Sequence, residues 1–80
     1  MVKNKDKTEI RIAVDSDFLK KLEKRLKLSR GTDVAKVALS ILDWASEETK
    51  DGRMILSTTK EGKNAHRLVL PELMQIKSAE

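Results

Sequence analysis

The sequence predicts a mainly α-helical fold with one β-strand near its N-terminus and a β-hairpin-like extension at its C-terminal end. Three observations lead to it: residues 9–14 alternate polar and apolar side chains, residues 16–50 hold two helical patterns, and two β-prone runs follow around a polar loop. A lone strand has backbone donors and acceptors that need a partner, and a two-stranded ribbon needs a cover for its apolar face. The simplest partner for this strand is the same strand of a second copy.

Length and cysteine content also favour an oligomer. The chain has 80 residues and no cysteine, so it forms one domain at most and has no disulfide or thiolate–metal staple. Residues 1–7 are polar, so we expect a flexible basic arm instead of a signal peptide. No stretch approaches the roughly 20 apolar residues of a membrane span. We therefore expect a cytoplasmic, oligomeric protein that does not associate with membranes.

Positive charge is concentrated in the first part of the chain. Residues 1–30 hold 10 Lys/Arg and 5 Asp/Glu, a balance of +5, whereas residues 31–80 hold 7 and 8, a balance of −1. A basic face on a small domain is the electrostatic footprint of a protein that binds nucleic acid. A solvated lysine-rich surface is the alternative interpretation.

A first helix is predicted to begin just after the strand. Residues 15–17, Asp-Ser-Asp, offer N-cap oxygens and a carboxylate near the positive end of the helix dipole. Phe18, Leu22 and Leu26 then recur every four residues between charged residues, which predicts an amphipathic helix of about three turns. Gly31 and Thr32 follow this pattern. We expect Gly31 to provide an unusual backbone angle in a turn and Thr32 to cap the next helix.

The second predicted helix runs from Asp33 and is apolar over much more than one face for its first three turns. Such a helix is surrounded by protein, and in so short a chain the surroundings must include a second subunit. Small Ala35 and Ala38 would let helices approach closely, and Trp44 is expected in the core. Gly52 is the predicted C-terminal stop.

The remaining residues, 53–80, form an extension with its own pattern. Two β-prone runs, 53–59 and 65–70, flank a Gly-containing polar loop and predict a hairpin. Pro71 ends the second run, and the residues after it form either one helical turn or a packed tail. The only histidine, His66, has no second histidine or cysteine nearby, so we expect no catalytic site, no metal site and no cofactor.

The order of strand, capped helix, short turn and largely buried helix resembles a known family. The segments Ile10-Arg11-Ile12-Ala13-Val14 and Leu28-Ser29-Arg30-Gly31-Thr32-Asp33-Val34 carry the resemblance, which is to the ribbon-helix-helix family of DNA-binding proteins, the Arc, MetJ and CopG-like group. It covers about residues 8–50 and implies an intertwined homodimer whose domain is residues 8–52. In this family the two strands pair antiparallel and enter the DNA major groove, with the N-terminus of the second helix on a phosphate.

This resemblance assigns roles to individual residues. With alternate apolar residues turned onto the helices, period two puts three residues on the solvent face of the ribbon. These candidate base-contacting residues are Glu9, Arg11 and Ala13. Arg11 can donate two hydrogen bonds to guanine, whereas Glu9 can only accept from cytosine and Ala13 can only touch a thymine methyl group. The residues expected in the dimer core are Ile10, Ile12, Val14, Phe18, Leu22, Val34, Val37, Ala38, Ile41, Leu42 and Trp44.

Phosphate contacts are expected at the start of the second helix, where unpaired N–H groups and the helix dipole favour an anion. There Thr32 can donate its hydroxyl and Asp33 only its backbone N–H. The complete set of candidate phosphate-contacting residues is Lys7, Ser29, Arg30, Thr32 and Asp33.

The expected function is that of a sequence-specific DNA-binding repressor, acting on its own operon or as the antitoxin of a toxin–antitoxin pair. The chain is not expected to be an enzyme. The alternative is a dimeric scaffold that captures a partner protein, such as a toxin, through residues 53–80. A third interpretation of that segment is that it only completes the surface of its own domain.

Overall fold

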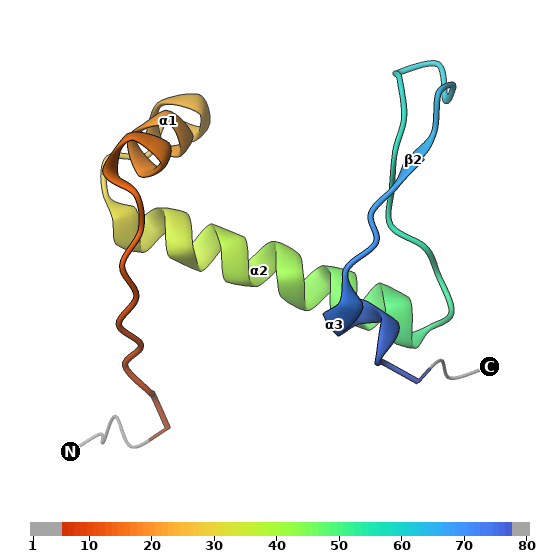
Figure 1. Cartoon of the computed structure of the whole chain (residues 1–80), viewed down its shortest axis with the longest axis horizontal. Helices are drawn as coiled ribbons and strands as arrows, with labels where there is room; N and C mark the ends of the chain where they lie inside the picture. Colours follow the sequence, from red (N-terminus) through yellow and green to blue (C-terminus); the bar gives the residue numbers. More distant parts are fainter. Residues whose placement is uncertain (1–5, 78–80) are drawn as a thin grey trace. The chain divides into compact units, whose positions relative to one another are not determined.

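The computed structural model describes residues 6–77, so most of the predicted arm 1–7 and residues 78–80 lie outside it. The elements are α1 (Ser16–Leu26), α2 (Gly31–Lys50), β1 (Leu56–Ser57), β2 (His66–Arg67) and α3 (Pro71–Met74) (Figure 1). About half of the chain is helical, with a short antiparallel sheet. It divides into two compact units, one up to Val34 and one from Ala35, which are described separately.

Helix α1 begins where the sequence predicts. The Asp15 carboxylate accepts a hydrogen bond from the Phe18 N–H at 2.9 Å, and the Asp15 carbonyl oxygen accepts one from the Leu19 N–H at 2.9 Å. The first bond satisfies a donor that the helix itself cannot pair, so Asp15 is the N-cap. The predicted start of the first helix is therefore confirmed.

Helix α1 ends at its C-cap, Lys27, a residue that the sequence pattern did not indicate as a helix stop. Lys27 has φ 59° and ψ 43°, in the left-handed region that favours glycine. The Leu28 N–H donates to the Glu23 carbonyl oxygen at 2.9 Å, and the Lys27 N–H donates to the Lys24 carbonyl oxygen at 3.3 Å. This pair of bonds is a Schellman motif, which closes the helix with a lysine in the strained position.

Gly31 does not adopt the unusual backbone angle that was expected of it. Its lack of a side chain instead leaves room for Leu19 of α1. Its φ is not positive, but a Cβ added to it would lie 3.0 Å from Leu19 Cδ2, so a side chain here would press on α1. Helix α2 also begins earlier than predicted, since the Arg30 carbonyl oxygen accepts from the N–H groups of Asp33 at 3.0 Å and Val34 at 3.3 Å. Arg30 therefore occupies the cap position, and the predicted capping role of Thr32 is wrong.

The other end of α2 confirms the predicted stop at Gly52. Gly52 has φ 81°, its N–H donates to the Thr49 carbonyl oxygen at 3.0 Å, and the Arg53 N–H donates to the Glu48 carbonyl oxygen at 2.9 Å. This is a second Schellman motif, here with the residue best suited to it. An ion pair between Arg53 Nε and Glu48 Oε1 at 2.7 Å joins the residue after the helix to its last turns.

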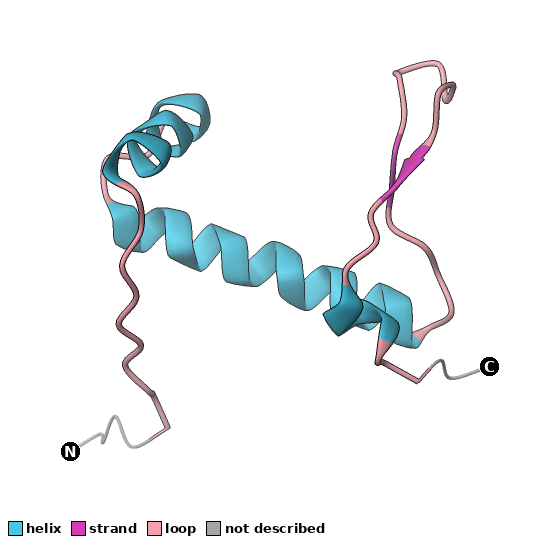
Figure 2. Cartoon of the chain, viewed as in Figure 1, coloured by secondary structure: helices cyan, strands magenta, loops and turns pink. Residues whose placement is uncertain are grey.

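The C-terminal extension contains the predicted hairpin, with shorter strands than the β-prone runs suggested. Leu56 pairs with Arg67 and Ser57 with His66, in antiparallel register (Figure 2). The Leu68 N–H donates to the Ile55 carbonyl oxygen at 2.8 Å, so the two sides of the hairpin stay paired for one more residue beyond each strand. Helix α3 then supplies the single helical turn that was one of the two expectations for the tail, with Pro71 in its first turn.

The described residues bury little apolar surface. Only Val34 in the first unit, and Ala45 and Leu73 in the second, are buried hydrophobic residues. None of the described helices is long and apolar enough to cross a membrane.

The predicted N-terminal strand has no partner among residues 6–77. The segment before α1 runs as an extended trace into the helix (Figure 1), and residues 9–14 belong to no sheet. Strand pairing needs a second segment at hydrogen-bonding distance, and the hairpin strands pair with each other instead. The strand at residues 9–14 therefore stays a prediction that depends on a second copy.

Replacing Lys27 with glycine should stabilise the protein. The substitution removes the cost of a side chain in the left-handed region, so we expect the free energy of unfolding to rise by about 1 kcal/mol. Urea denaturation at one fixed protein concentration measures it as a higher midpoint with an unchanged slope. Lys24→Gly, in the exposed interior of α1, is the matched control and should lower the midpoint. A lower midpoint for Lys27→Gly would show that this turn is not strained.

Candidate nucleic-acid interface

The segment from Glu9 to Val14 is open to solvent in the single chain. Ile10 is 72% exposed and Ile12 is 73% exposed, as much as free surface residues. Within residues 6–77, no backbone hydrogen bond involves residues 9–14. The backbone donors and acceptors of this segment therefore have no protein partner among the described residues, and its apolar side chains are uncovered. Both properties are typical of an edge strand that pairs with another chain.

The three candidate base-contacting residues lie on this segment. Glu9, Arg11 and Ala13 are all exposed, and in the described part of the chain Arg11 takes part in no ion pair. Its guanidinium group is therefore available for a bidentate contact with a planar acceptor. The single chain leaves both sides of the segment exposed, so the division into a base-reading side and a core side rests on the period-two pattern.

The N-terminus of α2 supplies two backbone donors. No hydrogen bond of the described residues uses the N–H of Gly31 or of Thr32, whereas the Asp33 N–H already donates to the Arg30 carbonyl oxygen. Sequence reasoning assigned the phosphate to Thr32 and Asp33, and the structure places the free donors one residue earlier, at Gly31 and Thr32. The signal that was missed is the cap position of Arg30, which fixes which N–H groups remain unpaired.

An ion pair spans the first turn of α2. Arg30 Nε lies 3.1 Å from Asp33 Oδ2, and Arg30 Nη2 lies 3.4 Å from Asp33 Oδ1, so the guanidinium contacts both carboxylate oxygens. It partly neutralises the carboxylate that would otherwise compete with an anion for the helix dipole. The i, i+3 spacing of Arg30 and Asp33 was a readable signal of this pair.

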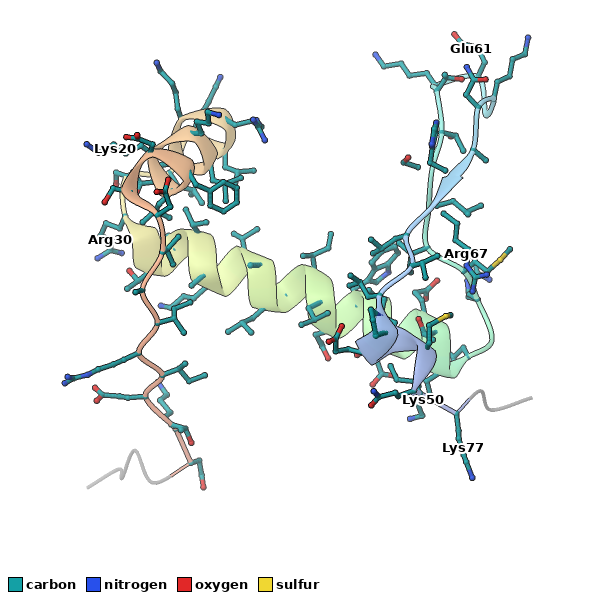
Figure 3. All side chains as sticks on the ribbon, viewed as in Figure 1. Lys20, Arg30, Lys50, Glu61, Arg67 and Lys77 are labelled. Atoms are coloured by element: carbon teal, nitrogen blue, oxygen red, sulfur yellow. The ribbon has the colours of Figure 1, made fainter. Side chains whose placement is uncertain are left out.

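The other candidate phosphate-contacting residues are exposed. Lys7 and Ser29 lie at the surface with no hydrogen bond to the rest of the described chain. Helix α1 adds further positive charge, and Lys20 and Arg30 extend outward from this unit (Figure 3). The exposed basic residues of α1 and its C-cap are Lys20, Lys21, Lys24, Arg25 and Lys27.

The predicted dimer core is only partly covered by the chain itself. Val34 is buried and Leu22 is half-buried, whereas Phe18 is 55% exposed and Trp44 is 51% exposed. The remaining members of the set are exposed as well. They are Ile10, Ile12, Val14, Val37, Ala38, Ile41 and Leu42.

The second unit has a shallow hollow on its hairpin. Its volume is about 320 Å³, it opens to solvent, and Ile55, Leu56, Ser57, His66, Arg67 and Leu68 line it. Among residues 6–77, no three His, Cys, Asp or Glu side chains gather closely enough to hold a metal ion.

The chain was compared with protein-family models, with curated proteins and with solved structures. None of the three comparisons finds a match. The assignment of function therefore depends on the residues and geometry described above.

The contact between Gly31 and Leu19 should be intolerant of a branched side chain. A Cβ at residue 31 would lie 3.0 Å from Leu19 Cδ2, and the two methyl groups of Gly31→Val add bulk at this contact. We therefore expect the free energy of unfolding to fall by roughly 1–3 kcal/mol. Thr32→Val, at an exposed position one residue later in the same helix, is the matched control and should change it little. Equal urea midpoints for both variants would show that α1 does not approach α2 closely at Gly31.

Proposed function

We propose that the protein is a homodimeric, sequence-specific DNA-binding repressor of the ribbon-helix-helix type. The observation that carries the proposal is the unpaired segment 9–14, which ends directly in a capped helix. Pairing of two such segments, one from each copy, makes a two-stranded ribbon of the size that enters the DNA major groove.

The exposed surface supports the dimer. Among the described residues of the first unit, Ile10, Ile12 and Phe18 are each more than half exposed. Helix α2 contributes much of the available apolar surface, with Leu39 58% exposed and Ile41 61% exposed. A second copy of the chain covers these residues and the apolar side of segment 9–14.

Sequence recognition falls mainly to Arg11. In the paired ribbon, Ile10 and Ile12 face the helices and Arg11 faces outward, once from each subunit. A guanidinium that donates to guanine O6 and N7 discriminates against other bases by roughly 1–3 kcal/mol. Glu9 and Ala13 flank it on the same side and contribute contacts to cytosine and to a thymine methyl group.

The start of α2 positions the dimer on the DNA backbone. The free N–H groups of Gly31 and Thr32, the Thr32 hydroxyl and the helix dipole form an anion site of the kind that binds phosphate. These contacts carry no sequence information, and they fix the register of the ribbon in the groove. Occupation of a site upstream of its own gene would make the protein an autoregulatory repressor, alone or as an antitoxin.

A second candidate function is a dimeric scaffold that captures a partner protein through the C-terminal extension. The exposed apolar side chains of this segment favour it, since Met54 is 58% exposed and Val69 is 59% exposed. Under this candidate, a purified dimer binds neither upstream nor scrambled DNA, even at low salt.

Ile12→Ser tests the dimer. In an isolated chain, loss of a side chain that is 73% exposed costs little. In a ribbon dimer the same change removes a core side chain from both subunits, so we expect about 2 kcal/mol or more per subunit and dissociation at micromolar concentration. Sedimentation equilibrium measures it, with Ala13→Ser on the opposite side as control. A monomeric wild type, or a stable Ile12→Ser dimer, contradicts the proposal.

Arg11→Ala tests base reading. We expect the variant to lose roughly 10-fold or more of the preference for DNA from upstream of its own gene over a scrambled duplex of equal length, because the bidentate contact is lost. Fluorescence anisotropy titrations at several fixed salt concentrations give both affinities. Arg25→Ala, which removes the same charge from α1, is the control and should leave the preference unchanged.

Thr32→Ala provides the contrasting outcome in the same titrations. It removes a phosphate contact, so it should weaken binding to both duplexes by the same factor. An Arg11→Ala variant with unchanged affinity and preference would contradict the assignment of Arg11 as a base-contacting residue.

A further inference from the structure

We infer that the C-terminal hairpin, residues 55–68, is a second DNA-contacting element that holds the phosphate backbone with Lys60, Lys63 and Arg67. This inference rests on the proposed function, because it gives the same DNA a second set of contacts. It also assigns a ligand class to the only sheet in the described chain.

The loop of the hairpin is held in one conformation by its own hydrogen bonds. The Thr59 N–H donates to the Lys63 carbonyl oxygen at 2.8 Å, and the Gly62 N–H donates to the Thr59 carbonyl oxygen at 2.9 Å. The Lys63 N–H also donates to Thr59 Oγ1 at 3.0 Å. Because the loop is already ordered, binding through it costs little conformational entropy.

The loop is also open to solvent around Gly62. Gly62 has φ 81°, and a Cβ added to it would meet no atom within 4 Å. Asn64, with φ 54°, lies at the end of the loop, two residues before β2. Figure 3 shows Glu61 at the tip of the hairpin and Arg67 extending from its side. A narrow ribbon with an open tip can reach a partner surface without clashes from its own unit.

The charge of the hairpin is positive and unpaired. From residue 55 to residue 68 there are three cations, Lys60, Lys63 and Arg67, and one carboxylate, Glu61. In the described part of the chain, the ion pairs use Arg30 and Arg53, so none of the three hairpin cations is neutralised by a carboxylate. The negative balance of residues 31–80 comes from acidic residues elsewhere, four of which lie at positions 43–51.

These features together favour a nucleic-acid phosphate backbone over other anions. DNA presents one negative charge per roughly 1.7 Å of helix axis, so cations spread from the tip to the strands can each meet a phosphate. Arg67 is paired with Leu56 in the strands, whereas Lys60 and Lys63 lie in the loop. The three positive charges are therefore spread along the hairpin. Lysine contacts phosphates as a point charge and arginine can do so with two hydrogen bonds.

The test is a salt titration of DNA binding by the full-length dimer. The triple variant K60Q/K63Q/R67Q is compared with K36Q/K50Q/K77Q, which removes three exposed cations from the same unit outside the hairpin. We expect the hairpin variant to lower the slope of log K against log salt by at least about 1.8, which corresponds to one phosphate contact on each of two hairpins. The ratio of affinities for upstream and scrambled DNA should stay unchanged.

Glu61→Gln gives a test in the opposite direction. Removal of the carboxylate at the tip should raise affinity for both duplexes about 2-fold or more, because a charge repelled by phosphate is lost. Circular dichroism and sedimentation confirm that each variant keeps the fold and the dimer.

The outcomes separate this inference from the proposed function. If the wild type distinguishes upstream from scrambled DNA but the hairpin variant keeps the full slope, the hairpin inference is wrong and the repressor proposal stands. The hairpin would then be left for a protein partner. Equal slope losses in K60Q/K63Q/R67Q and K36Q/K50Q/K77Q assign the effect to net charge and also overturn the inference. A wild type that binds no DNA overturns both.

Discussion

The unsatisfied backbone of residues 9–14 is the constraint on which the rest of the interpretation depends. Backbone N–H and C=O groups in an extended segment require partners, and apolar side chains such as Ile10 and Ile12 require cover. Residues 6–77 of a single chain provide neither a backbone partner nor this cover. Pairing with a second copy satisfies both needs at once, and it creates an outward-facing side on which Arg11 appears twice.

Local signals in the sequence predicted most of the secondary structure. Asp15 caps α1 because a short acceptor precedes an amphipathic run, and Gly52 ends α2 because glycine adopts positive φ without strain. The errors arose where the same local signal had two solutions. Gly31 was expected to bend the chain, but Lys27 takes that conformation, and Gly31 makes room for Leu19 instead. Which residue bends and which makes room depends on how α1 approaches α2, and that approach is not encoded in any single residue type.

The candidate site divides in the same way. The division of residues 9–14 into two faces stays a prediction from the period-two pattern, whereas the ion pair between Arg30 and Asp33 follows a known spacing that was not used to predict it. The identity of the free N–H groups at α2 could not be predicted, because it depends on which residue occupies the cap. Averaging charge over residues 31–80 also concealed the basic hairpin, since the acidic second half of α2 cancels it in the sum.

The large exposed surface of the single chain has a consequence for the amount of protein that must be present. For a fold completed by a second copy, folding and association form one equilibrium, and each tenfold dilution reduces apparent stability by about 1.4 kcal/mol. The concentration of DNA-binding species then varies with the square of the chain concentration when most chains are unpaired. A repressor built in this way responds to its own level as a threshold: dilution during cell growth would release its DNA more abruptly than loss of a monomeric protein could.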